Sequence, residues 1–297
     1  VPSYKTAPVS EWLGSHVYAA LGIPVHETVL GIRDGRIVCA CRDFTFPDSR
    51  LVNFHDLKNS LSDDEPGFTE DASTGSGVVL ADVRSAIHRI PVLRSIDGVS
   101  DRFWDMFVVD AFIRNIDRNN TNWGVLRNPR GEFSLAPVYD NGNSFNNKRT
   151  DSGIERRLAN PDLIRQDALD VRSCYVTDRG KPIAPLKYLA SGQDEECTKA
   201  LDRFMERYDP RSFHDLLGSI PSMSHGLTVV PDGFHEYHRM VCDYRYEHAF
   251  MEAWRDLHPT VGVPSSPEAS VPEPLPDPDP SVLPSSSVPT CFDGPGM

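Results

Sequence analysis

The spacing of hydrophobic and polar residues divides the beginning of the chain into a helix and a hairpin. Across Val9–Leu21, apolar residues recur at the i, i+3, i+4, i+7 spacing of an amphipathic helix, and Gly22 follows the last of them. Val25–Gly31 and Arg36–Cys41 are rich in strand-forming residues, and the Asp34-Gly35 pair between them is a strong hairpin signal. This part of the chain therefore predicts a helix followed by two paired strands.

The middle of the chain combines a core helix with a second hairpin. Val99–Arg114 is apolar nearly all round, which is typical of a helix buried on every side. After a polar loop, Trp123–Arg127 and Glu132–Ala136 favour two short strands around the turn Asn128–Gly131. The chain should therefore leave the end of the helix, make a short excursion and return.

The candidate chemistry lies on either side of this excursion. Asp117 and Asn122 follow the core helix in a run of Asn and Asp, whose short polar side chains favour loops over helices. If Arg127 pairs with Glu132, Asp140 comes back to within a few residues of Asn122, roughly 10 Å along an extended chain. Asp117, Asn122 and Asp140 can then converge on one point.

Two carboxylates and an amide oxygen are hard ligands that suit magnesium. Phosphoryl transfer uses such a set, with an Asp that orients a hydroxyl, an Asn five residues later on a metal ion and a further Asp on the metal. Asp117 and Asn122 are thus candidate catalytic residues, and Asn122 and Asp140 are candidate metal ligands. Two alternatives remain: a polar loop with Tyr139 packed in the core, or a hydrolase that uses the two carboxyls as an acid and base.

Composition and charge narrow the class of protein. The 297 residues, 39% of them hydrophobic, suffice for one large or two modest domains. With 43 acidic and 30 basic residues the net charge is −13, so we expect no direct contact with nucleic acid. No stretch approaches the roughly 20 apolar residues of a membrane span, and the beginning does not read as a signal peptide. We therefore expect a soluble, cytoplasmic protein without a membrane partner.

The cysteines and the glycine-rich stretch give no site of their own. The six cysteines are scattered without a Cys-x-x-Cys pair, although Cys39 and Cys41 should face the same side of one strand. Neither a zinc site nor a disulfide framework is predicted. Ser73–Gly77 invites a phosphate-loop interpretation but lacks the Gly-Lys-Ser/Thr ending, so we expect it to cap a helix over Val78–Arg89.

The remainder of the chain is expected to be loop, then helix, then tail. Phe46–Gly77 is polar and rich in turn-forming residues, and a basic loop after Asp140 either docks a substrate or is simply solvated. Three later stretches have helical spacing, and the histidines among them read as packing or surface residues: Cys197–Tyr208, Arg211–Ser219 and Phe234–Leu257. From Pro259 the chain is rich in Pro and Ser and has no Lys or Arg, which predicts an acidic disordered tail.

Two segments, Asp117–Asn122 and Leu135–Asp140, resemble the catalytic loop and metal-binding segment of HipA-type bacterial serine/threonine kinases. Phosphatidylinositol kinases also pair an Asp-Arg-x-x-x-Asn loop with a later Asp-x-Gly, but the Ala-Pro-x-Tyr-Asp context is more similar to the HipA type. Asn119 stands where many members have His. Because Asn can still bond the backbone of the loop, we interpret it as a variant and not as a loss of activity.

The resemblance implies an α+β, protein-kinase-like fold with a truncated, small β-containing N-lobe and a larger, mainly helical C-lobe that carries a catalytic β-hairpin. The N-lobe remnant would be residues 1–45, the C-lobe 46–258 and the tail 259–297. The implied activity is Mg-ATP-dependent phosphorylation of Ser or Thr in a protein substrate, with ATP and Mg²⁺ as cofactors. The resemblance also implies a toxin-type kinase of a toxin–antitoxin pair as one form of this activity. A kinase-like binding module without catalytic activity is the alternative.

The resemblance also assigns cofactor-binding residues outside the loop. Glu11 would pair with a phosphate-binding lysine, although an acidic residue in a first helical turn is ordinary. Asp43 and Phe44 would belong to the hinge that contacts adenine, or else Phe44 ends a strand in the core. Lys5 is the one candidate lysine and reads as linker. We therefore expect the strands that cover the phosphates to precede Val1 or to come from a separate N-terminal subunit, and an antitoxin is a further expected partner.

Overall fold

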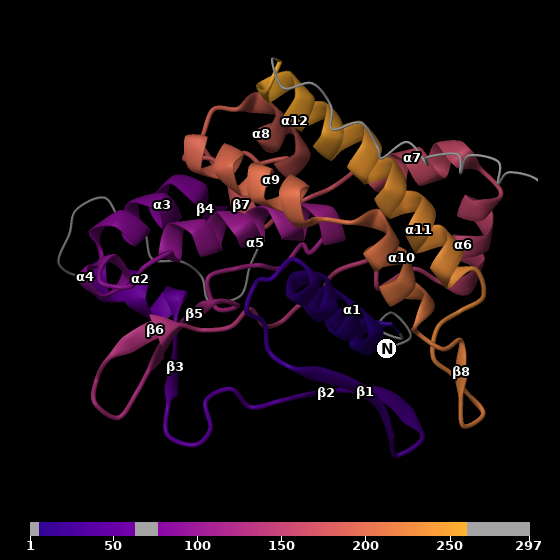
Figure 1. Cartoon of the computed structure of the whole chain (residues 1–297), viewed down its shortest axis with the longest axis horizontal. Coiled ribbons are helices and arrows are strands. Elements are labelled where there is room, and N and C mark those ends of the chain that lie inside the picture. The colour runs from indigo at the N-terminus through magenta and orange to yellow at the C-terminus, as the bar shows by residue number, and fades with distance from the viewer. Residues whose placement is uncertain (1–5, 63–76, 260–297) are drawn as a thin grey trace, which may run out of the picture. The chain divides into compact units, whose positions relative to one another are not determined.

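The computed structural model describes residues 6–62 and 77–259, which form an α+β fold (Figure 1). At the beginning, α1 (Ala7–Ala20) packs against a hairpin of β1 (Thr28–Arg33) and β2 (Arg36–Cys41). Asp34 and Gly35 form the two-residue turn with φ of 52° and 68°, the left-handed values that such a turn requires. The predicted helix and hairpin are confirmed, with β1 beginning at Thr28.

A three-stranded sheet in the order β3-β5-β6 holds the second hairpin. Its strands are β3 (Arg50–Asn53), β5 (Gly124–Arg127) and β6 (Phe133–Leu135), and α2 (Phe54–Ser62) follows β3 directly. The expectation of turns throughout residues 46–77 was wrong for this part. The pairing of β3 with β5 joins segments more than 70 residues apart, and such a contact leaves no local pattern in the sequence.

The register of the β5–β6 hairpin differs by one residue from the predicted one. Arg127 lies opposite Phe133 and not Glu132. The side chain of Asn128 accepts hydrogen bonds from the backbone N–H groups of Arg130 and Glu132, both at 2.9 Å, and Gly131 adopts a φ of 82°. These bonds close a loop one residue longer than expected, and the hairpin still returns the chain to the polar loop.

The rest of the described chain is mainly helical, as predicted. The core helix is α5 (Val99–Ile113), which packs on α9 (Glu195–Arg207), and Phe103, Phe107 and Phe112 lie within its buried surface. The other elements of this part are β4 (Val78–Val79), α3 (Leu80–Arg89), α4 (Pro91–Arg94), α6 (Asp151–Leu158), α7 (Pro161–Leu169), β7 (Tyr175–Val176), α8 (Pro185–Ser191), α10 (Pro210–Gly218), β8 (Met223–Ser224), β9 (Leu227–Thr228), α11 (Phe234–Arg245), a π-helical turn (Tyr246–Phe250) and α12 (Met251–Leu257). In Figure 1, α11 continues through the π-helical turn into α12.

Part of the basic loop after Asp140 has a structural role. Arg149 and Arg157 both form ion pairs with the buried carboxylate of Asp167 on α7, and the Tyr237 hydroxyl donates to the same carboxylate at 2.6 Å. The predicted loop ran from Asn141 to Arg157, and its residues from Asp151 on are helical, as α6 (Asp151–Leu158). Arg157 therefore anchors α6 to α7, and Arg149 anchors the residues before α6, instead of facing a substrate phosphate.

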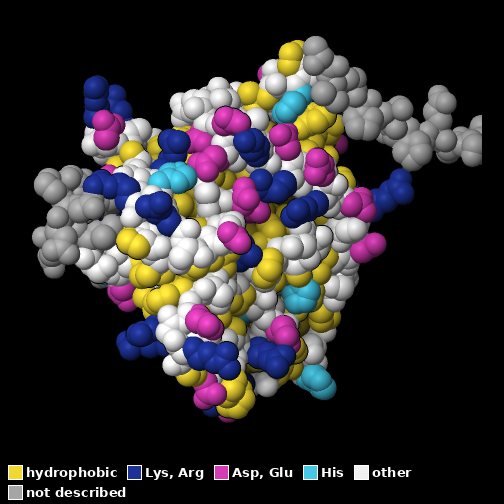
Figure 2. Space-filling model, turned by 60° about the vertical axis from the view of Figure 1, so that its left-hand side comes forward, with side chains coloured by type: hydrophobic (Ala, Val, Ile, Leu, Met, Phe, Trp, Pro, Cys, Tyr) yellow, Lys and Arg dark blue, Asp and Glu magenta, His cyan; other side chains and the backbone are white. Residues whose placement is uncertain are grey.

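The surface and the remaining sequence expectations are consistent with these elements. On the face drawn in Figure 2, acidic and basic side chains are interspersed and form no broad basic patch. Among the described helices, none combines the length and the apolar character needed to cross a membrane. Outside the described residues lie Lys5, the Ser73–Gly77 stretch apart from its last residue, and the predicted tail apart from its first residue, Pro259.

Candidate active site

The polar loop begins where the core helix ends. Arg114 closes α5 with a φ of 57°, a left-handed conformation that turns the chain out of the helix. The backbone N–H of Asp117 then donates to the Asn115 side chain at 3.1 Å, and that of Thr121 donates to the Asn119 side chain at 2.9 Å. The Asn side chains thus bond the backbone of their own loop, as the sequence predicts for Asn119.

The carboxylate of Asp117 is held by two amide groups. Asn119 Nδ2 donates to Oδ1 at 3.0 Å, and Asn143 Nδ2 donates to Oδ2 at 2.8 Å. An ionised carboxylate has about four acceptor positions, so each oxygen keeps a lone pair for another donor. Asp117 is therefore fixed in orientation but still able to accept a hydrogen bond from a substrate hydroxyl.

One buried guanidinium joins the two halves of the site. Arg118 is 1% exposed, and its Nε donates to the Asp110 carboxylate of α5 at 2.9 Å. Its Nη1 donates to the backbone carbonyls of Asn122, at 2.9 Å, and Tyr139. Its Nη2 reaches the side chain of Asn141. A single side chain thus ties the polar loop and the segment around residue 140 to the core helix.

Asn122 and Asp140 present oxygen atoms with few protein partners. Asn122 Nδ2 donates to the backbone carbonyl of Asp117 at 2.7 Å, and within residues 6–62 and 77–259 the Thr121 hydroxyl, at 3.2 Å, is the one donor to Asn122 Oδ1. Asp140 adopts a φ of 58°, and among the described residues no donor hydrogen-bonds to its carboxylate. Amide and carboxylate oxygens without donors are what a hard divalent cation requires.

The electrostatic surroundings of Asp140 also suit a cation. Desolvation by the surrounding protein raises the pKa of its carboxyl, while the Arg118 guanidinium lowers it and the carboxylates of Glu11 and Asp117 raise it again. Three carboxylates therefore lie near one another with one buried guanidinium beside them. A divalent cation would offset their mutual repulsion, and so the residues present fit magnesium.

Glu11 contacts the segment that bears Asp140. Its Oε1 lies 2.8 Å from His26 Nε2, and its Oε2 accepts the backbone N–H of Asn141 at 2.8 Å. Among the described residues, no lysine pairs with Glu11. The helix α1 therefore positions the backbone next to Asp140 through this carboxylate.

The two predicted hinge residues differ in their surroundings. The exposed carboxylate of Asp43 accepts the hydroxyl of Thr45 at 2.6 Å and its N–H at 2.8 Å, and these bonds lower the Asp43 pKa. Phe44 is only partly buried, and its ring lies 5.6 Å from that of Tyr139 and 6.4 Å from that of His26. Phe44 therefore flanks the site, and Asp43 shapes the turn.

Sequence reasoning missed several residues that hold the site together. Asp110 also accepts the Tyr18 hydroxyl at 2.8 Å. Asn143 donates to Asp117, and Asn141 and His26 contact Glu11, as described above. Asp110 left one usable signal, because it stands within the otherwise apolar run Val108–Ile113 near the end of the core helix, and a carboxylate buried there must find a partner. The others follow from contacts between distant segments.

Comparisons with known proteins point to a kinase. No family model matches the chain. The serine/threonine-protein kinase CtkA of Helicobacter pylori is 33% identical over 224 residues, which are 75% of this chain and 66% of CtkA, just under two thirds of its length. The crystal structure of a H. pylori proinflammatory kinase CtkA has a TM-score of 0.76 at 28% identity, over 86% of this chain and 89% of that one.

The resemblance to HipA-type serine/threonine kinases is confirmed by the likeness to CtkA. The α+β, kinase-like fold expected from the sequence is confirmed by the same likeness. The structure of Shewanella oneidensis HipA with HipB and operator DNA has a TM-score of 0.45 at 11% identity, over 83% of this chain and 57% of that one. This likeness is too low to support an argument about the chain.

Proposed function

We propose that the chain is a Mg-ATP-dependent kinase that phosphorylates Ser or Thr of a protein. The observation that carries this proposal is the arrangement around Arg118, which joins the loop of Asp117 and Asn122 to the segment of Asp140. The likeness to CtkA, named as a serine/threonine-protein kinase, supports the same reaction. CtkA is longer than the part matched, so the activity of this chain is our proposal.

Each residue of the site has a distinct task in this proposal. Asp117, held by Asn119 and Asn143, accepts the hydrogen bond of the substrate hydroxyl and directs its oxygen toward the γ-phosphate. Asn122 Oδ1 and the Asp140 carboxylate would hold magnesium, which supplies charge neutralisation on the phosphate oxygens when bound. Little covalent work is asked of the protein, so catalysis rests on the positions of these groups.

The nucleotide is assigned to the side of the site that the β1–β2 hairpin flanks. The chain leaves β2 at Arg42, whose N–H is bonded to the Glu27 carbonyl at 2.9 Å, and then passes Asp43 and Phe44. We assign adenine to the backbone of this connection, with the ring of Phe44 as an adjacent apolar surface. The carboxylate of Asp43, which is committed to Thr45, has no direct role in this assignment.

The proposal is tested by the transfer of γ-phosphate from radiolabelled ATP to the chain or to a generic protein substrate. Asp117→Asn and Asp140→Asn should each lower the rate about 100-fold or more, because a positioned base or charge is lost. Asp215→Asn, at an exposed position on α10, is the matched control and should keep the wild-type rate. Equal transfer by all four proteins, prepared identically and folded by circular dichroism, would exclude the assignment.

One observation favours a second candidate, a kinase-like binding module without catalysis. Both oxygens of Glu11 are already engaged, with His26 and with the N–H of Asn141, instead of with a lysine of the described residues. Such a module would bind a partner protein and show no magnesium-dependent affinity for ATP. Calorimetry with ATP, with and without magnesium, separates the two candidates.

A further inference from the structure

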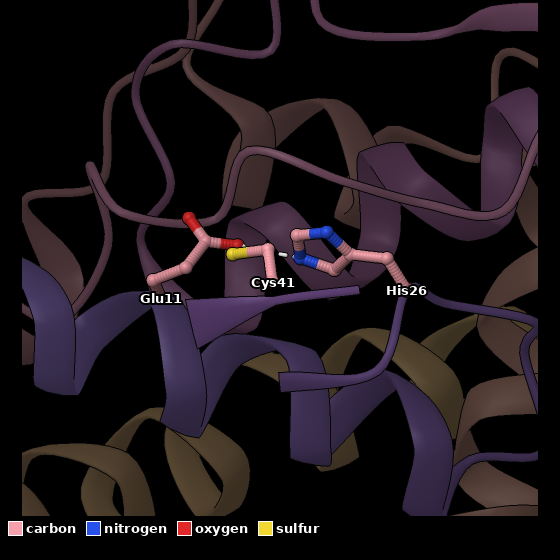
Figure 3. Close-up of side chains that lie close together, drawn as sticks. All are labelled: Glu11, His26 and Cys41. Carbon is pink, nitrogen blue, oxygen red and sulfur yellow. Dashed lines mark hydrogen bonds and ion pairs between the residues drawn. The ribbon is translucent and has the colours of Figure 1, made fainter. Parts of the chain in front are cut away.

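Three side chains with metal-binding atoms meet beside the proposed magnesium site. Glu11 comes from α1, His26 from the segment before β1, and Cys41 from the last residue of β2, and their ligand atoms all lie within 4.8 Å of one another. Figure 3 shows the carboxylate, the imidazole and the sulfur directed toward one another. The residues are spaced fifteen apart in the chain, so no short motif announces the cluster, and the sequence predicted no zinc site.

The ligand types in this cluster select a soft or borderline cation. Thiolate sulfur and imidazole nitrogen bind Zn²⁺ readily, whereas magnesium takes oxygen ligands. Zinc bonds of about 2.0–2.3 Å in a tetrahedron separate the ligand atoms by roughly 3.3–3.7 Å. The 2.8 Å contact between Glu11 and His26 would have to lengthen by less than 1 Å, and Cys41 would move closer. Only small side-chain shifts are therefore needed.

The cluster is open on one side. The side chain of His26 is 6% exposed and that of Glu11 is 13% exposed, while Cys41 is exposed at the strand end. Three protein ligands with one accessible direction are the arrangement in which zinc keeps a solvent molecule as the fourth ligand. Cys39, on the same face of β2, is not one of the clustered ligands.

We propose that Glu11, His26 and Cys41 form a binding site for a thiophilic divalent cation, with Zn²⁺ as the ion that fits the ligand set. Glu11 would use Oε1 for the ion while its Oε2 keeps the N–H of Asn141, which follows Asp140 directly. The site is distinct from the magnesium ligands Asn122 and Asp140, and it stands whether or not the chain transfers phosphate. Because the Glu11 carboxylate would bind both the ion and the N–H of Asn141, occupancy by Zn²⁺ would fix the backbone beside the magnesium site.

The test is the affinity of the full, reduced chain for Zn²⁺, measured by competition with a chromophoric chelator, and the spectrum of the Co²⁺ form. One high-affinity ion per chain is expected, and Co²⁺ should give the sulfur-to-metal charge-transfer band of a thiolate ligand. Cys41→Ala and His26→Gln should each weaken binding by at least about tenfold, because loss of an outer-shell partner alone costs that much. Cys41→Ala should also abolish the charge-transfer band.

Matched controls separate this site from other thiols and from the magnesium site. Cys39→Ser, two residues away on the same strand, should keep both the affinity and the band, and Asp140→Asn should keep Zn²⁺ binding while it loses magnesium-dependent ATP binding. Should Cys39→Ser weaken binding as much as Cys41→Ala, or should the wild-type chain bind no Zn²⁺, the three side chains are only an ion pair beside a thiol and the proposal is overturned. Because metal binding is measured directly, failure of the kinase proposal leaves this result unaffected.

Discussion

Replacement of Asp110 by Asn would test whether Arg118 organises the active site. Asp110 Oδ1 accepts the Tyr18 hydroxyl and Asn115 Nδ2, at 2.8 and 3.1 Å, while Oδ2 accepts Arg118 Nε at 2.9 Å. In Asp110→Asn, an NH₂ group would replace one of these oxygens. It would either face the Arg118 guanidinium or take the place of the oxygen that accepts Tyr18 and Asn115, and so break those two hydrogen bonds. The volume is unchanged, so the effect reports on charge and hydrogen bonding.

The expected loss of stability in Asp110→Asn follows from the burial of the Arg118–Asp110 ion pair. Arg118 and Asp110 have side-chain exposures of 1% and 7%, and removal of one partner of such a pair typically costs about 3–5 kcal/mol. Arg118 keeps three other acceptors, so we expect about 3 kcal/mol. The control is Asp162→Asn, which breaks the pair with Arg165 at side-chain exposures of 82% and 57% and should cost less than about 1 kcal/mol.

The measurement is the free energy of unfolding in urea, followed by tryptophan fluorescence, for the wild type and both variants. γ-Phosphate transfer is then assayed at a temperature where Asp110→Asn is folded, and it should be lost along with the attachment of the loop to the segment of Asp140. Losses of stability that agree within 1 kcal/mol between the two variants, or full transfer activity in Asp110→Asn, would refute the reasoning.

Two further changes probe the site and the core. Asn143→Ala removes one of the two amides that hold Asp117, so kcat should fall about tenfold while the KM for ATP stays constant, as measured by steady-state kinetics; a change confined to KM would contradict the positioning role. Burial lowers the pKa of His238 to about 3, whereas its pKa in the unfolded chain is about 6.5. Below pH 6.5 the unfolded state therefore binds a proton at this histidine that the folded state does not bind, and the protein becomes less stable as the pH is lowered. Between pH 7 and pH 5 this histidine should remove about 2 kcal/mol from the free energy of unfolding; urea unfolding of His238→Phe should lack that part of the loss, and equal losses in both proteins would show that His238 is protonated in the fold.

The local part of the site could be predicted from the sequence. Asp117 and Asn122 lie in a run of Asn that bonds its own backbone, and this tendency is a property of the residues themselves. The β5–β6 hairpin could also be predicted from its turn residues, but its register could not. The extra loop residue depends on four hydrogen bonds donated by backbone N–H groups around Asn128 and Gly131, which a count of turn residues does not specify.

Contacts between segments that are far apart in the chain could not be predicted from the sequence. Glu11 was predicted to pair with a phosphate-binding lysine. In the structure it contacts His26 and the backbone of Asn141, which is 130 residues away. Cys41 joins the same group only because the β1–β2 hairpin packs against α1. A periodic pattern predicts which face of an element is buried, but which two buried faces meet depends on the packing of the whole fold.

In the proposed kinase, Asn122 and Asp140 hold the cation that carries the nucleotide. Titration calorimetry of ATP into the wild-type chain and into Asp140→Asn, each with and without magnesium, tests it most directly. We predict binding in the wild type that depends on magnesium, and at least about tenfold weaker binding in the variant, since one of the ligands would be gone. An affinity for ATP that is the same without magnesium, or the same in Asp140→Asn, would contradict the account.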